Sequence, residues 1–573
     1  MRNVLAFLVV VAALGAGCTG TTPDLGSASC TPSCASGLTC IDNADFPGGI
    51  CTASCSSSGT CAAGSKCVQL STGEFCVPAC AEGDACPTGL VCGSGGSAGK
   101  VCLAPAPAPA TAVSCPNAPA ANYGGTINVA EFAGCVQPIV QSTYAPAPPA
   151  VGATLSLGQH QVGEQVQFQL PAGTSGFTVV SQGQSTNVPL VSAFGGVLPN
   201  SPIPTPIGAP DGAFFDYVDS FGQAPSDRML TFSPLSPVTA AVTFPNGTAG
   251  LRKAAQGLTP GTWTLTVSDI LHECQAFACG DPASGSTSNR YDVTVLTRSG
   301  GIPDRGGLDL AIYVVSDTLT AASATDDPNF RRMLQRVTAD FSRAGICLQT
   351  VTYYDVPAWA RARWASVTVS PAAAAQPCSE YRQLLTLARA GNVVSLFFVD
   401  EVTEPNAPVG SRLIGYDGAI PGVSTFNGTT AGGALVSSAD LASTSGCGSG
   451  SFNTGCGPDV VGETVAHEVA HALGLFHTTE SLGASGEDFD PLTDTPQCLC
   501  SLCVSDSARG NCADQTGATG QPTTVDATSC VQGTQACGGA DYLMFWQLSN
   551  LSRGNLSPQE GQVMRMNPLV RPL

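Results

Sequence analysis

Charged side chains are scarce in this sequence, and positive charge is the scarcest. Only 11% of the 573 residues are Asp, Glu, Lys or Arg, against about 25% in an average soluble domain. The 22 Lys and Arg are outnumbered by 42 Asp and Glu, which gives a formal net charge of −20. Because so acidic a chain repels phosphate backbones and offers no basic cluster to offset the repulsion, we exclude nucleic acid as a partner.

Long apolar runs are missing except at the N-terminus. There Arg2 precedes the run Val4–Leu14, which is too short to span a bilayer comfortably and is typical of a signal peptide. The run ends in LGAGC, which is similar to a bacterial lipobox. We therefore predict a signal peptide over 1–17, lipidation of Cys18, a tether over 18–29 and export, either as an outer-membrane lipoprotein or into the medium. An ordinary cleaved signal peptide is the alternative to the lipid anchor, and membrane contact is expected through that anchor only.

Cysteine, in contrast, is plentiful. The chain has 27 cysteines, and without Cys18 the number is even, which indicates disulfides and an oxidising compartment. Residues 30–102 contain 12 of them in a repeat of about 25 residues, and units this small need covalent staples because they cannot bury a core. The alternative is metal binding, but the spacing lacks paired CxxC knuckles and His. The repeat therefore predicts a disulfide-rich module over 30–102.

The pattern of apolar residues changes twice along the remainder of the chain. An Ala/Pro-rich linker region is predicted over 103–150. Alternating apolar and polar residues at 166–170, 263–267 and 291–295 are typical of half-buried strands and predict a β-sandwich over 151–299. From 302 to 573 the pattern is mixed and predicts an α/β domain. We expect its strands at 308–315, 348–354, 393–399 and 434–438 and its helices at 329–344 and 380–390.

Three of the five His of the chain fall within residues 467–477. On a helix, His467 and His471 lie about 40° apart in azimuth and about 6 Å apart along the axis, so both rings face one point. If the helix continued, His477 would lie about 15 Å from His467 along the axis, whereas two nitrogens on one zinc lie within about 4 Å. The backbone must therefore turn, and Gly474 is the residue that permits the turn.

The three His leave a fourth zinc position for water, which is typical of a catalytic rather than a structural site. We expect one catalytic zinc held by His467, His471 and His477, with Glu468 as the general base that takes a proton from the zinc-activated water during hydrolysis of a peptide bond. Ordinary core histidines are the alternative for isolated His, and a metal site without activity is the alternative for the cluster. His160 and His272 lack neighbours of metal-ligand type.

The segment 467–477 matches HExxHxxGxxH and resembles the signature of the metzincin zinc peptidases. This resemblance implies a mixed five-stranded sheet above an active-site helix and a methionine-bearing turn below the metal. The sequence DYLMFW at 541–546 resembles that turn and assigns Met544 to it, with an ordinary core role for Met544 as the alternative. The loop DPLTDTP at 490–496, the cysteines after it and the expected helix at 556–564 are similar to the pappalysin branch. The resemblance covers about 302–573.

The same branch typically binds calcium near its acidic loop. Here Asp488, Asp490 and Asp494, with Glu487, carry the hard oxygens that calcium prefers, and a solvated acidic loop is the alternative. One departure is Trp546, which stands where the branch usually has Tyr. Taken together, these residues predict an exported zinc endopeptidase that acts on proteins or peptides. The alternative is a surface adhesion or recognition lipoprotein whose peptidase-like domain is inactive.

Overall fold

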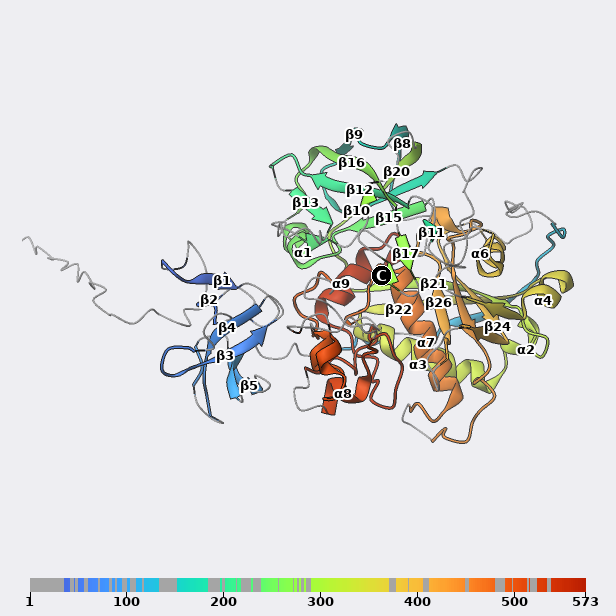
Figure 1. Cartoon of the computed structure of the whole chain (residues 1–573). Coiled ribbons are helices and arrows are strands. Elements are labelled where there is room, and N and C mark those ends of the chain that lie inside the picture. Colours follow the sequence, from blue (N-terminus) through green and yellow to red (C-terminus); the bar gives the residue numbers. More distant parts are fainter. Residues whose placement is uncertain are drawn as a thin grey trace, which may run out of the picture. The chain divides into compact units, whose positions relative to one another are not determined.

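The computed structural model describes residues 34–573 with gaps, the longest of which are 133–151, 184–195, 218–227, 230–238 and 480–489. The predicted signal peptide, Cys18, the tether, His272 and Asp488 lie outside the described residues. The chain divides into two compact units, Met1–Pro105 and Ala106–Leu573 (Figure 1). Within the part of the chain that the structure describes, no helix combines the length and the apolar character needed to cross a bilayer.

The N-terminal unit is a row of small hairpins held by disulfides. Its antiparallel pairs are β1 and β2 (Thr39–Ile41, Ile50–Thr52), β3 and β4 (Ser65–Leu70, Gly73–Pro78), and β5 and β6 (Val91–Ser94, Lys100–Leu103). The second and third repeats share one connectivity, first to third and second to fourth cysteine: Cys55–Cys67 with Cys61–Cys76, and Cys80–Cys92 with Cys86–Cys102. The predicted disulfide-rich N-terminal region is thus confirmed.

Residues 152–300 contribute two main antiparallel sheets around one core. One sheet has the order β15-β10-β20-β8, and the other joins β12, β16 and β9. Their bounds are β8 Thr154–Gln161, β9 Gln165–Leu170, β10 Thr174–Gly183, β12 Ser201–Gly208, β15 Thr239–Phe244, β16 Gly261–Leu271 and β20 Arg290–Ser299. Buried aromatic rings from both sheets, among them Phe168, Phe177 and Trp263, pack at the centre. The three strands expected from alternation are β9, β16 and β20. We call this part the β-sandwich.

The C-terminal part is built on a mixed seven-stranded sheet. Its main order is β26-β27-β24-β21-β22-β7, with β28 pairing beside β21; β26 and β28 are antiparallel to their neighbours and the other pairs are parallel. The bounds are β7 Ala120–Thr126, β21 Gly306–Val314, β22 Ile346–Asp355, β24 Val394–Val399, β26 Gly415–Asp417, β27 Ala434–Ser437 and β28 Arg571–Pro572. All six residues of β24 are buried, as expected for a strand covered on both faces.

Helices cover both faces of this sheet. The helices are α3 Pro328–Arg343, α4 Ala358–Trp364, α6 Glu380–Leu385, α7 Gly457–Ala472 and, near the C-terminus, α9 Pro558–Met566. Alternate residues of β21 pack into two separate clusters. Ile312 packs in one cluster with α3 and α7, and Tyr313 packs in the other with α4 and α6. The predicted helix over 380–390 is shorter than expected because hydrogen bonds between residues three apart replace the α-helical pattern up to Ala388.

One strand of the sheet comes from an unexpected place. Strand β7 lies within the stretch that the sequence analysis assigned to a linker, yet it pairs in parallel with β22. The disulfide Cys115–Cys347 fastens the same segment to the start of β22. The strand has the sequence AANYGGT, which lacks an alternation of apolar and polar residues, so the sequence did not reveal it. The β-sandwich is therefore inserted between the first strand of the α/β part and the remainder of that part.

Candidate metal centre

The site is built on α7, whose ends follow from its sequence. Pro458 and Asp459 lie in the first turn. Proline loses no hydrogen bond at this position, and an acidic side chain here interacts favourably with the helix dipole. The helix ends at Ala472, and Gly474 has a φ of 107°, a conformation that L side chains rarely adopt. The backbone turns there, as the spacing of the motif requires.

The turn brings the three His side chains together. The Nε2 atoms of His467, His471 and His477 lie 3.1–3.2 Å from one another. Three nitrogens at about 2.0–2.1 Å from a tetrahedral zinc would lie about 3.3 Å apart. The described rings therefore form a cradle of the right size and donor type for one such ion.

The outer nitrogens of two rings fix which nitrogen carries the proton. Nδ1 of His467 lies 2.7 Å from the carbonyl oxygen of Leu543, and Nδ1 of His471 lies 2.8 Å from that of Leu475. Because a carbonyl oxygen only accepts hydrogen bonds, each Nδ1 carries the proton, and Nε2 of the neutral ring presents a lone pair. Burial, with the neighbouring His467 and His477, lowers the pKa of His471 well below its ordinary value. The three ring nitrogens lie close enough together to hold one metal ion.

Glu468 lies on the face of α7 next to the one that carries His467 and His471. Its carboxylate points toward the edge strand β26. Its side chain is almost fully buried, and its carboxylate fills the space beside Gly415, where an added Cβ atom would overlap Oε1. Burial, and secondly the nearby carboxylate of Asp417, raise the pKa of Glu468 well above its ordinary value. The sequence motif supplied Glu468, but it did not indicate that a glycine on another element makes room for it.

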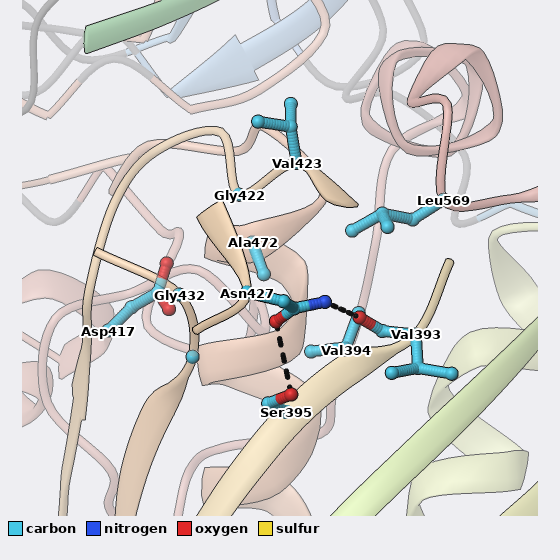
Figure 2. A pocket seen from close by; sticks show the side chains of 11 residues that line it. Val393, Val394, Ser395, Asp417, Gly422, Val423, Asn427, Gly432, Ala472 and Leu569 are labelled. Atoms are coloured by element: carbon cyan, nitrogen blue, oxygen red, sulfur yellow. Dashed lines mark hydrogen bonds between the residues drawn. The ribbon is translucent and has the colours of Figure 1, made fainter. Parts of the chain in front are cut away.

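A second buried carboxylate, Asp417, lies at the end of β26. Its Oδ2 has no hydrogen-bond partner among the described residues, and burial raises its pKa well above the ordinary value. Asp417 lines a small cavity with Gly422 and Ala472, beside the C-terminal end of α7 (Figure 2). Buried Arg382 donates to the carbonyl oxygens of Gly418 and Thr430 nearby. No sequence motif pointed to Asp417 or Arg382.

The segment containing Met544 supports two of the three His. The carbonyl of Leu543 accepts from His467, and the carbonyl of Met544 accepts from the backbone amide of Thr478, directly after His477. The Met544 side chain is fully buried in the hydrophobic cluster that includes Val469 and Ala470 of α7. Its surroundings fit both the predicted turn and the alternative of an ordinary core methionine.

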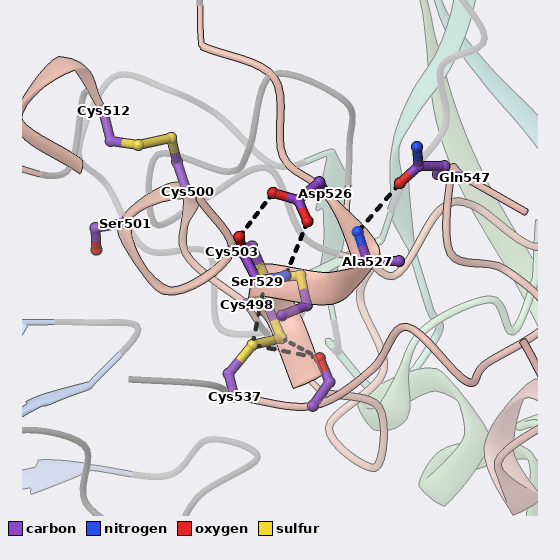
Figure 3. Close-up of a disulfide and its surroundings, with 12 residues drawn as sticks. Cys498, Cys500, Ser501, Cys503, Cys512, Asp526, Ala527, Ser529, Cys537 and Gln547 are labelled. Atoms are coloured by element: carbon purple, nitrogen blue, oxygen red, sulfur yellow. Dashed lines mark hydrogen bonds between the residues drawn. A yellow bond between two sulfur atoms is a disulfide. The ribbon is translucent and has the colours of Figure 1, made fainter. Parts of the chain in front are cut away.

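A disulfide-rich loop adjoins this turn. It contains Cys498–Cys537, Cys500–Cys512 and Cys503–Cys530, and its core cluster includes Phe545. Figure 3 shows the backbone amide of Ala527, at the start of α8 (Ala527–Gln532), donating to the Gln547 side chain. The loop therefore holds the chain that follows Met544.

The residues expected to bind calcium are placed in part. Asp490 is buried and accepts from the hydroxyl of Thr495. Asp494 accepts from the Ser557 hydroxyl and from the backbone amide of Gln559, so it caps α9. Within the described ranges, neither joins a group of three or more potential metal ligands. Calcium binding stays a prediction.

No protein-family model matches this chain, and no curated protein matches it. Among solved structures, metalloproteinase-II from Bacteroides fragilis matches over 40% of this chain and 72% of its own, at 10% sequence identity and a TM-score of 0.18. A likeness with so low a TM-score carries no argument about fold or function.

Proposed function

We propose that this chain is a zinc-dependent endopeptidase. The observation that carries the proposal is the convergence of three Nε2 atoms within 3.2 Å of one another, with the outer nitrogens of His467 and His471 bonded to carbonyl oxygens. A bound zinc ion would act as a Lewis acid and lower the pKa of a water molecule at its open position. Glu468, the neighbour of His467 in sequence, would accept the proton of that water.

The edge of the sheet beside Glu468 suits an extended peptide. Among the described strands, β26 pairs only with β27, so its other edge pairs with no described strand. A peptide that pairs with β26 would gain main-chain hydrogen bonds without regard to its sequence. Because Gly415 of β26 adjoins the Glu468 carboxylate, such a peptide would pass next to the general base.

The test uses the purified full chain, its metal content and fluorescein-labelled casein. We expect one zinc per chain, cleavage that a chelator abolishes and added zinc restores, and loss of cleavage by about two to four orders of magnitude in Glu468→Gln. The variant should keep its zinc, because Glu468 is not a ligand in this scheme. A fully metallated protein that cleaves neither casein nor a broad peptide library would refute the proposal and favour a recognition protein with an inactive domain.

We also propose, on the sequence resemblance alone, that the enzyme belongs to the pappalysin branch of the metzincins and that its acidic loop binds calcium. Export and lipidation at Cys18 are proposed on the N-terminal pattern. The disulfides of the described residues support an oxidising compartment. Mass spectrometry of the mature N-terminus would show whether Cys18 carries a lipid.

A further inference from the structure

The inserted β-sandwich reaches the metal-binding helix through a buried arginine. Arg298 lies at the end of β20 and is 1% exposed. Its Nη1 donates to two backbone carbonyl oxygens of the C-terminal segment, those of Asn567 at 3.0 Å and Val570 at 2.6 Å. A guanidinium buried in this way holds the main chain at two points three residues apart.

Asn567, whose carbonyl accepts from Arg298, in turn bonds to the last residue of α7. The Asn567 side-chain amide donates to the carbonyl oxygen of Ala472 at 3.0 Å and to that of Gly422 at 3.3 Å. Its Oδ1 accepts from the backbone amide of Leu569, which fixes the orientation of the side chain. Ala472 is the last residue of α7, so its carbonyl has no intrahelical donor and accepts from residues outside the helix.

A second, apolar route leads to the same place. Residues 418–431 follow β26, and the backbone amide of Gly422 in this segment donates to the carbonyl of Ala472 at 2.9 Å. The segment is covered by the β-sandwich in one buried cluster. The cluster joins Val180, Ala241 and Leu296 of the β-sandwich to Ala419, Val423, Phe426 and Ala431 of the segment. The continuation of β26 is thus held between the β-sandwich and the end of α7.

We infer that the β-sandwich is a positioning element of the β26 edge of the site, acting through Arg298 and the apolar cluster on residues 418–431. The inference rests on the proposed function for its catalytic consequence. Loss of the Arg298 contacts removes one of the restraints on Asn567 and so weakens the joint between the end of α7 and the segment after β26. Because α3 and the core of the α/β part still hold the rest of α7, the main effect falls on β26 and on substrate that pairs with it.

The test compares Arg298→Met with Arg298→Lys, which keeps a cationic donor, and with Arg290→Met, which removes an exposed arginine from the same strand. In Arg298→Met, hydrogen–deuterium exchange in residues 418–431 should accelerate about tenfold or more. With labelled casein, KM should rise about tenfold with kcat within about twofold, since β26 would bind the substrate strand less firmly while the zinc ligands and Glu468 keep their places. Arg298→Lys should recover most of both effects, and Arg290→Met should match the wild type.

Unchanged exchange in residues 418–431, or a fall in kcat with KM unaltered, would overturn the inference. If Arg298→Met does not fold, the milder Leu296→Ala, which trims the apolar cluster, decides by the same two measurements. The exchange experiment needs no substrate. If wild-type protein cleaves no casein, the proposed function fails, and the exchange result still decides whether the β-sandwich positions this joint.

Discussion

The smallest scale of the site is the ring nitrogen and what it contacts. The spacing of the motif was enough to predict that His467, His471 and His477 converge, because helix geometry and a glycine turn are local properties. The carbonyl of Leu543 that orients His467 comes from 76 residues away. No local pattern specifies such a contact, because it depends on how distant segments pack.

Gly415 offers a test at the scale of one methyl group. In Gly415→Ala the new Cβ would overlap the Glu468 carboxylate, so we expect casein cleavage to fall about tenfold to a hundredfold through displacement of the base. Zinc content, measured by elemental analysis, should stay at the wild-type value because no ligand moves. Gly510→Ala is the control, since a Cβ there would meet nothing within 4 Å. Full activity in Gly415→Ala would contradict the position given to Glu468.

At the scale of elements, the strongly patterned ones were predictable. Helix α3 and strands β21, β22 and β24 lie within a few residues of their expected positions, and α7 ends just before Gly474, where the motif required a turn, because each has a clear apolar period or motif. Strand β7 and the strand-end residue Asp417 were not predictable. Their roles depend on β22 and α7, which lie far away in sequence. Buried charge between α3 and α7 was likewise missed, since periodicity reports apolar faces only.

That buried charge predicts a pH effect on stability. Asp340 of α3 contacts Arg336 at 2.8 Å and Arg343 at 3.9 Å, and Arg336 also binds Glu463 of α7. Burial, only partly offset by Arg336, raises the pKa of Asp340 from 3.8 to about 7. Between these two values the folded state holds a proton that the unfolded state releases. The contribution of Asp340 to the free energy of unfolding is therefore full below pH 4 and is lost as the pH rises to about 7.

Replacing Asp340 by Asn should remove this dependence. We expect the melting temperature of wild-type protein to fall more steeply between pH 4.5 and 7 than that of Asp340→Asn. The corresponding difference in slope of the free energy of unfolding is at most roughly 1.4 kcal/mol per pH unit. The control is Asp326→Asn, which changes an exposed aspartate just before α3. This variant should follow the wild type. Parallel curves for wild type and Asp340→Asn, recorded by circular dichroism, would show that Asp340 is ionised in both states.

At the scale of the whole molecule, the α/β part is discontinuous in sequence. Strand β7 pairs with β22, Cys115 is bonded to Cys347, and the backbone amide of Val113 donates to the carbonyl of Ser342 at the end of α3. The boundary at residue 302, drawn from a change of rhythm, marks where the β-sandwich ends. It does not mark where the α/β part begins. A change in periodicity locates the edges of a module but cannot reveal that one module is inserted into another.

Two shortened chains test this organisation. A chain that begins at Ala106 lacks only the N-terminal unit, so it should melt near the wild-type temperature and bind one zinc. A chain that begins at Ile302 lacks β7 and the β-sandwich, which exposes the edge of β22 and the apolar surface around Phe426. We expect this second chain to aggregate, or to melt far lower with less than one zinc bound, because exposed edges and apolar patches favour association.

The disulfide Cys115–Cys347 accounts for a separable part of the stability that the chain beginning at Ile302 loses. It closes a loop between residues 232 apart in sequence, so replacing both Cys115 and Cys347 by Ser in the chain that begins at Ala106 should cost about 2–5 kcal/mol. If covalent linkage were the whole effect, this double variant would be as unstable as the chain that begins at Ile302. We expect it to keep its zinc and an intermediate melting temperature, because β7 and the β-sandwich still cover the surfaces that the shorter chain exposes.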